Sequence, residues 1–225
     1  MYTLWIANKT YSSWSLRPWL LMKALAVPFE EKLVVFGGGV DFKTFSPSGR
    51  VPCLIDGDIA VWDSLAIVEY LAERHEGVWP KGAVARAWAR SAAAEMHSGF
   101  TALRDECSMS CGQRVSLHRR SAALEADIAR IGRLWTEGLD RFGGPWLAGD
   151  RIGAVDAFYA PVAFRARTYG LDFGGRSGEW LARILDQPAM KEWYEAALAE
   201  TFREAGHDEH IASRGQVIED LRVAV

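Results

Sequence analysis

The chain has 225 residues, of which 49% are hydrophobic, 12% aromatic and 24% charged, and its formal net charge is −3. This composition supplies one sizeable core or two small adjacent ones and excludes intrinsic disorder as a description of the whole chain. No stretch concentrates the basic residues, which argues against nucleic acid as the main ligand.

The sequence gives no sign of export or of membrane insertion. Residues 1–5 have no positively charged segment ahead of an apolar run, and the longest apolar runs are too short to span a bilayer. The three cysteines, Cys53, Cys107 and Cys111, are too few for a disulfide framework, and their spacing fits no common zinc motif. We therefore expect a cytoplasmic protein with no metal site.

The first eighty residues alternate short apolar runs with helical patterns. Residues 2–7 are rich in strand formers, residues 16–26 have apolar side chains at helical spacing, and residues 29–36 read as a second strand. A strand, a helix and a strand in so short a span predict a right-handed crossover with parallel pairing. The Asp56-Gly57-Asp58 turn then predicts a hairpin of residues 53–55 and 59–62, and Asp63-Ser64 marks the start of a helix.

From residue 83 onward the pattern is helical. Pro80 and Gly82 mark a boundary within residues 78–82, so we expect domains at 1–80 and 83–225. Four segments have helical character, with an interruption at Cys111-Gly112: residues 83–107, 115–142, 153–169 and 190–198.

Three stretches together resemble the glutathione transferase superfamily: Tyr11-Ser12-Ser13-Trp14-Ser15-Leu16-Arg17, Arg50-Val51-Pro52-Cys53-Leu54, and the run from Trp62-Asp63-Ser64 to Leu71. The resemblance implies an α+β fold: a thioredoxin-like domain (βαβ-ββα, mixed four-stranded sheet) that binds glutathione, followed by an all-α domain that forms the second-substrate site. It also implies a homodimer. The paired serines resemble the zeta class, which includes maleylacetoacetate isomerases, but Trp14 stands where that class has cysteine.

The serines of the first loop are the candidate catalytic residues. A hydroxyl just before a helix can donate a hydrogen bond to an anion at the positive helix end, and the thiolate of glutathione is such an anion. A hydrogen bond to a charged group contributes about 1.5–3 kcal/mol, enough to bring a thiol of pKa about 8.5 near neutrality. Ser12 is our first choice, and Ser13 and Ser15 remain competitors because Ser15 also suits a helix cap.

The resemblance also implies the residues that hold the tripeptide. Val51-Pro52 resembles the cis-proline element of the family, in which the main chain of the preceding residue pairs with the cysteinyl part of glutathione. Arg50 suits the glycyl carboxylate, and Asp63 and Ser64 suit the γ-glutamyl end. An ordinary turn proline, a solvated arginine and a helix cap are the alternative interpretations.

The second-substrate candidates are Trp14, Met96, His97 and Phe100, although aromatic and apolar residues are equally suited to the core. Arg90, His97, Arg104 and Cys111 recur every seven residues and predict one polar stripe along a single helix. Arg17 is expected to pair with a carboxylate of the helical domain. Asp156 resembles the family's buried folding aspartate, which satisfies helix or loop amides.

These features predict a glutathione transferase that attacks a small electrophile. The alternatives are a glutathione-dependent cis–trans isomerase and a non-catalytic ligand-binding or protein-interaction module on the same fold. The sequence of residues 207–225 indicates no particular functional or structural role.

Overall fold

The computed structural model describes residues 1–224. The N-terminal part is a thioredoxin-like domain whose four-stranded sheet has the order β2-β1-β3-β4, with β2 parallel to β1 and the other pairs antiparallel. Its elements are β1 (Tyr2–Ala7), α1 (Ser13–Ala24), β2 (Phe29–Val34), a 3-10 turn η1 (Phe42–Thr44), β3 (Cys53–Asp56), β4 (Ile59–Trp62) and α2 (Ser64–Ala72).

The local sequence explains these elements. Gly57, which has a φ of +58°, makes the tight turn that lets β3 and β4 pair in register. Helix α1 begins three residues earlier than expected, so Pro18 is its sixth residue and lies inside the helix, where its missing N–H removes one main-chain hydrogen bond. The parallel pairing expected for the two strands of the crossover and the mixed sheet implied by the family resemblance are confirmed.

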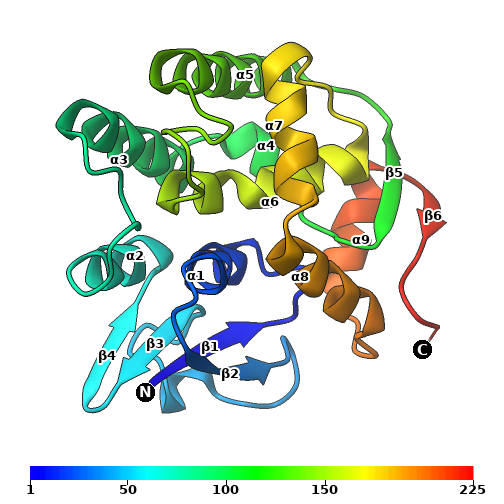
Figure 1. Cartoon of the computed structure of the whole chain (residues 1–225). Coiled ribbons are helices and arrows are strands. Elements are labelled where there is room, and N and C mark those ends of the chain that lie inside the picture. The colour runs from blue at the N-terminus through cyan, green and yellow to red at the C-terminus, as the bar shows by residue number, and fades with distance from the viewer. Residues whose placement is uncertain (225) are drawn as a thin grey trace.

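The C-terminal part is a helical domain that packs on the opposite side of α1 from the sheet (Figure 1). Its helices are α3 (Ala83–Ser98), α4 (Thr101–Glu106), α5 (Ala122–Phe142), α6 (Ala154–Tyr169), α7 (Gly175–Leu185), α8 (Pro188–Ala199) and α9 (Ala205–Arg214). Helix α6 is apolar on nearly all sides and almost wholly buried, so it forms the centre of the core and packs directly against α1.

Asp156 fixes the start of α6. Its fully buried carboxylate accepts hydrogen bonds from the main-chain N–H of Leu147 at 3.0 Å, that of Gly153 at 3.0 Å and the Trp180 indole at 2.9 Å. Burial raises the pKa of Asp156 to about 6, against the effect of these three donors. The structural role suggested by the family resemblance thus has a physical basis.

Two parts of the helical prediction are wrong. The helix expected over residues 83–107 breaks between α3 and α4, where Phe100 has a φ of +57° and a side chain on Gly99 would clash with the Glu95 carbonyl. The polar stripe expected along one helix is therefore divided. Residues 115–117, expected to start the helix over residues 115–142, instead belong to β5 (Gln113–Leu117), which pairs antiparallel with β6 (Gly215–Asp220).

This small second sheet joins the C-terminal segment to the loop between α4 and α5 (Figure 1). The sequence offered no interpretation for that segment. None of the helices described within residues 1–224 is long and apolar enough to cross a membrane.

Candidate active site

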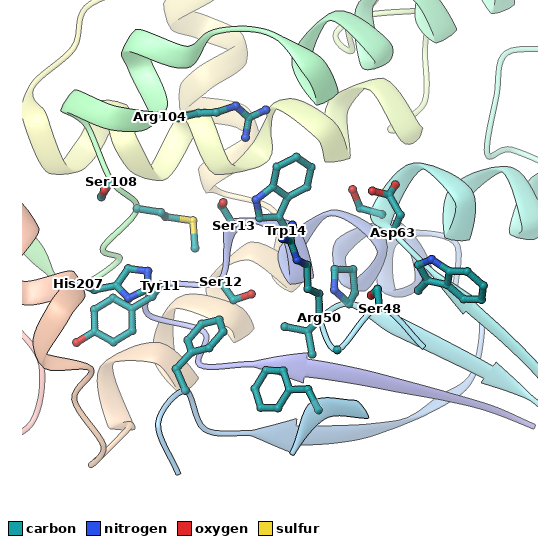
Figure 2. Close-up of a pocket in the computed structure, with 18 of the residues that line it drawn as sticks. Tyr11, Ser12, Ser13, Trp14, Ser48, Arg50, Asp63, Arg104, Ser108 and His207 are labelled. Atoms are coloured by element: carbon teal, nitrogen blue, oxygen red, sulfur yellow. The ribbon is translucent and has the colours of Figure 1, made fainter. Parts of the chain in front are cut away.

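A cavity of about 1040 Å³ lies where the loop before α1 meets the helical domain (Figure 2). Its size is at the upper end of the range of about 300–1,000 Å³ usual for small-molecule sites. Residues from both domains line it: Tyr11, Ser12, Ser13, Trp14, Phe36, Phe42, Ser48, Gly49, Arg50, Val51, Pro52, Trp62, Asp63, Ser64, Arg104, Ser108, Met109, Arg165 and His207.

Ser12 occupies the residue before α1 and lines the cavity. Its hydroxyl caps no helix N–H; instead it donates a 2.7 Å hydrogen bond to Ser15 Oγ. The hydroxyl therefore lies at the positive end of a twelve-residue helix and remains free to rotate toward a ligand.

The other two serines have different surroundings. Ser15 is fully buried and does not line the cavity, and its Oγ accepts a 3.2 Å hydrogen bond from the main-chain N–H of Ala7. Ser13 lines the cavity, and its Oγ accepts a long 3.4 Å hydrogen bond from Arg165. Ser15 thus anchors the loop, while Ser12 and Ser13 face the cavity.

The Val51-Pro52 peptide bond is cis, as the family resemblance implies. Both residues line the cavity, and within residues 1–224 the main-chain N–H and C=O of Val51 have no hydrogen-bond partner. Arg50 precedes them at the exposed rim of the cavity (Figure 2). An unpaired main chain just ahead of β3 can pair with a peptide-like ligand.

Asp63 and Ser64 begin α2 on the neighbouring wall. Asp63 Oδ1 accepts a 2.8 Å hydrogen bond from Leu65 N–H, and Asp63 has a φ of +74°, a strained value for a residue with a side chain. Ser64 is fully buried, and its Oγ accepts a 3.3 Å hydrogen bond from Arg17. Both residues therefore lie where a helix N-terminus opens into the cavity.

Arg17 does not pair with a carboxylate of the helical domain, contrary to the sequence-based expectation. Its guanidinium lies 4.1 Å from the Trp14 ring centroid and 4.8 Å from that of Phe158. The side chain is fully buried, because α1 packs against α6 at this point, and only its bond to Ser64 occupies an N–H group. Burial, together with the nearby Arg104 and Arg165, lowers the pKa of Arg17.

Of the four second-substrate candidates, only Trp14 lines the cavity. Met96 and Phe100 are buried in the core of the helical domain. His97 lies behind the wall, where its ring contacts Trp14 edge-on at a centroid distance of 5.2 Å and its Nε2 is 3.5 Å from Asp63 Oδ2. Burial lowers the pKa of His97, so the neutral imidazole predominates near pH 7.

Several residues that line the cavity were not identified as site residues from the sequence. Arg104 reaches from α4 toward Trp14, and His207 comes from α9 and stacks on Tyr11 with ring centroids 5.0 Å apart (Figure 2). Arg165 comes from the buried face of α6. The heptad spacing of Arg104 was its one visible signal, whereas no local pattern marked Arg165 or His207 as part of a site.

Together these groups favour an anion with a peptide-like body. The cavity presents two hydroxyls at a helix N-terminus, the unpaired main chain of Val51 and three arginines, against Asp63 as the only carboxylate among the described lining residues. Within residues 1–224 no group of three or more histidine, cysteine or acidic side chains is placed to hold a metal ion. Cys107 and Cys111 are buried, and burial raises the pKa of both thiols.

Comparisons with known proteins match both halves of the chain. Residues 11–74 match the family model for the glutathione S-transferase N-terminal domain, and residues 83–196 match that for its C-terminal domain. Glutathione S-transferase GstB of Escherichia coli strain K12 is 27% identical over 220 residues, which cover 85% of this chain and 97% of that protein.

Two further similarities extend over most of the chain. A probable maleylacetoacetate isomerase of Caenorhabditis elegans is 27% identical over 202 residues, covering 82% of this chain and 88% of that protein. The crystal structure of a glutathione transferase homolog from Burkholderia gl BGR1, with bound glutathione, has a TM-score of 0.63 at 20% identity and covers 87% of this chain and 97% of that one.

Proposed function

Because the chain belongs to the glutathione S-transferase family, we propose that it is a glutathione transferase in which the Ser12 hydroxyl stabilises the thiolate of bound glutathione. The observation that carries this proposal is the position of Ser12: its hydroxyl lies in the cavity wall at the start of α1 and caps no helix N–H. A hydroxyl without a capping role at this position is available to a ligand.

The tripeptide would lie along the thioredoxin-like side of the cavity. The free N–H and C=O of Val51 would pair with its cysteinyl residue as an added strand does. Its γ-glutamyl carboxylate would meet the N-terminus of α2 at Ser64, with its ammonium beside Asp63. Arg50 at the rim would meet the glycyl carboxylate.

In this position the sulfur would accept a hydrogen bond from Ser12. The Ser12 hydroxyl now donates to Ser15 Oγ, so it must rotate to donate to sulfur. Ser15 Oγ, held by the N–H of Ala7, can then donate its own proton to Ser12 Oγ. Each serine therefore keeps a hydrogen bond while the thiolate gains one.

The serine needs no covalent step of its own. The thiolate sulfur uses a lone pair to form a bond to the electrophilic carbon of the second substrate. In a substitution, the leaving group departs with the electron pair of its bond; in an addition, the displaced π pair takes a proton from water. Ser12 holds the sulfur as an anion until that bond forms.

The test is a pH titration of the ultraviolet thiolate band of glutathione bound to the wild type and to two variants. Ser12→Ala should raise the pKa of the bound thiol by about 1–2 units, because a hydrogen bond to a charged group is worth about 1.5–3 kcal/mol. Ser13→Ala is the matched control, since its hydroxyl also lines the cavity but accepts only the long bond from Arg165. An unchanged pKa in Ser12→Ala, or an equal shift in Ser13→Ala, would overturn the role of Ser12.

Glutathione-dependent isomerisation is the second candidate, favoured by the match to the probable isomerase of Caenorhabditis elegans. It would use the same thiolate, which adds to a cis double bond and leaves after rotation, so that glutathione is regenerated. Counting glutathione consumed per product formed separates the two reactions: a transferase consumes one per turnover, and an isomerase consumes none.

A further inference from the structure

The helical wall of the cavity carries arginines that no carboxylate contacts directly. Arg104 and Arg165 both line this wall, and Arg17 lies behind it, against the Trp14 ring. Within residues 1–224 none of the three guanidinium groups forms an ion pair with a carboxylate; their hydrogen bonds go to neutral oxygens. By contrast, the largely buried guanidinium of Arg222 pairs with the carboxylates of Asp208 and Asp220.

Burial makes this arrangement costly. Arg165 is 4% exposed, and its guanidinium donates only to the Cys107 carbonyl and to Ser13 Oγ, which leaves its Nε without a partner. Burial and the charge of Arg104 lower the pKa of Arg165 to about 10, so it remains charged at neutral pH at a cost in free energy. Contacts with the Trp14 ring offset part of the cost for Arg104 and Arg17 but supply no counter-charge.

The proposed position of glutathione does not use these arginines. Its carboxylates are met by Arg50 and by the start of α2, both on the thioredoxin-like side. Arg104 is placed on the other side of Trp14, on α4, while Arg165 reaches the cavity beside Ser13 (Figure 2 shows Arg104, Trp14 and Ser13). The positive wall therefore faces the space left for the second substrate.

We propose that Arg104 and Arg165 bind the carboxylate of the second substrate, so that the enzyme selects electrophiles that are organic acids. This inference rests on the proposed function, because it assumes that glutathione fills the thioredoxin-like side. Arg104 is the outer group: its Nε and one terminal nitrogen donate to main-chain carbonyls at the end of α3, including Gly99 at 3.0 Å, which fixes the guanidinium in place. Arg165 is the inner group and links the carboxylate site to the Ser13 end of the serine loop.

The first experiment measures binding without turnover. The protein is saturated with S-methylglutathione, which cannot react, and is titrated by calorimetry with 3,5-dinitrobenzoate and with 3,5-dinitrobenzamide, its neutral counterpart. We expect the acid to bind about 10- to 100-fold more tightly than the amide, as charge-assisted hydrogen bonds imply. Equal affinities would overturn the proposal, because the arginines would then serve no carboxylate in the second-substrate space.

Variants assign the preference to this wall. Arg165→Met and Arg104→Met should each reduce the preference for the acid by about tenfold or more. Arg167→Met is the matched control: Arg167 lies two residues along the same helix, outside the cavity, with its guanidinium 3.9 Å from the Tyr194 ring centroid. A preference that survives both cavity variants, or that Arg167→Met abolishes equally, would overturn the assignment. If a variant fails to fold, the comparison of acid and amide on the wild type still decides the proposal.

A turnover assay with a reactive pair separates this proposal from the proposed function. Glutathione is offered 4-chloro-3,5-dinitrobenzoate or the corresponding amide; a carbon–sulfur bond forms and chloride leaves with the carbon–chlorine electron pair. Each kcat/KM is divided by the rate constant of the uncatalysed reaction with glutathione, and we expect the acid to be favoured about tenfold. If the enzyme turned over the acid and the amide without preference, the carboxylate site would be refuted, but the proposed function would not. If S-methylglutathione does not bind, the proposed function fails. The affinities for the acid and the amide are then compared on the protein without S-methylglutathione.

Discussion

Ser15→Ala separates the structural role of the serine loop from its chemical role. Ser15 is fully buried, accepts a hydrogen bond from Ala7 N–H at 3.2 Å and contacts the Ser12 hydroxyl at 2.7 Å. Removing its hydroxyl leaves the Ala7 N–H buried without a partner. It also removes the group that can donate to Ser12 when Ser12 donates to sulfur.

The two effects have different expected sizes. An unsatisfied buried N–H costs about 1–3 kcal/mol, so the free energy of unfolding should fall by that amount. Polarisation by a neighbouring hydrogen bond adds about 10–30% to a bond worth about 1.5–3 kcal/mol, or about 0.2–0.9 kcal/mol. The pKa of bound glutathione should therefore rise by only about 0.1–0.7 units, well below the shift expected for Ser12→Ala.

Urea denaturation and titration of the thiolate band measure the two quantities on the same sample. We expect a clear loss of stability with a small shift in the thiol pKa. A Ser15→Ala protein of unchanged stability, whose thiol pKa rises as far as in Ser12→Ala, would refute it, because Ser15 would then be the residue that contacts the sulfur.

Two other predictions concern stability. Burial raises the pKa of Asp156 to about 6, against 3.8 as its ordinary value, so the native state binds the carboxyl proton more tightly than the unfolded state does. The contribution of Asp156 to the free energy of unfolding should therefore fall by up to about 3 kcal/mol as pH rises from about 4 to about 6. Urea denaturation at pH 4.5 and 7.5 checks this, and an identical pH dependence in Asp156→Asn would contradict it. Arg222 pairs with Asp208 at 3.0 Å and donates to the Tyr11 hydroxyl at 2.8 Å, so Arg222→Met should lower the free energy of unfolding by about 1–3 kcal/mol, measured in the same way. No loss of stability would mean that this contact does not hold the C-terminal segment in place.

The thioredoxin-like half was predictable because its signals are local. The run at residues 2–7, the Asp56-Gly57 turn and the cap at Asp63 each specify an element within a few neighbouring residues. The expected positions of Ser12, Val51 and Asp63 follow from these elements. All three line one cavity, although the tripeptide contacts themselves stay predictions.

The helical half was less predictable because its determinants are tertiary. Arg165 lies on a helix that is buried all round, so no polar face distinguished it from its apolar neighbours. Residues 115–117 of β5 were assigned to a helix because the partner strand β6 lies at the far end of the chain and gives no local signal. The break before α4 depends on Phe100 in a left-handed conformation, which its side chain does not favour by itself.

The pairing of β5 with β6 also affects the order in which the molecule folds. Gln113 and Asp220, which are bonded across this sheet, are 107 positions apart in the chain, whereas Ser12 and Ser15 are separated by three. Contacts between distant positions require closure of a long loop, and such contacts form slowly. The thiol side of the cavity can thus assemble from nearby residues early in folding, while the wall that carries His207 waits for contacts such as this one, which joins positions 107 apart.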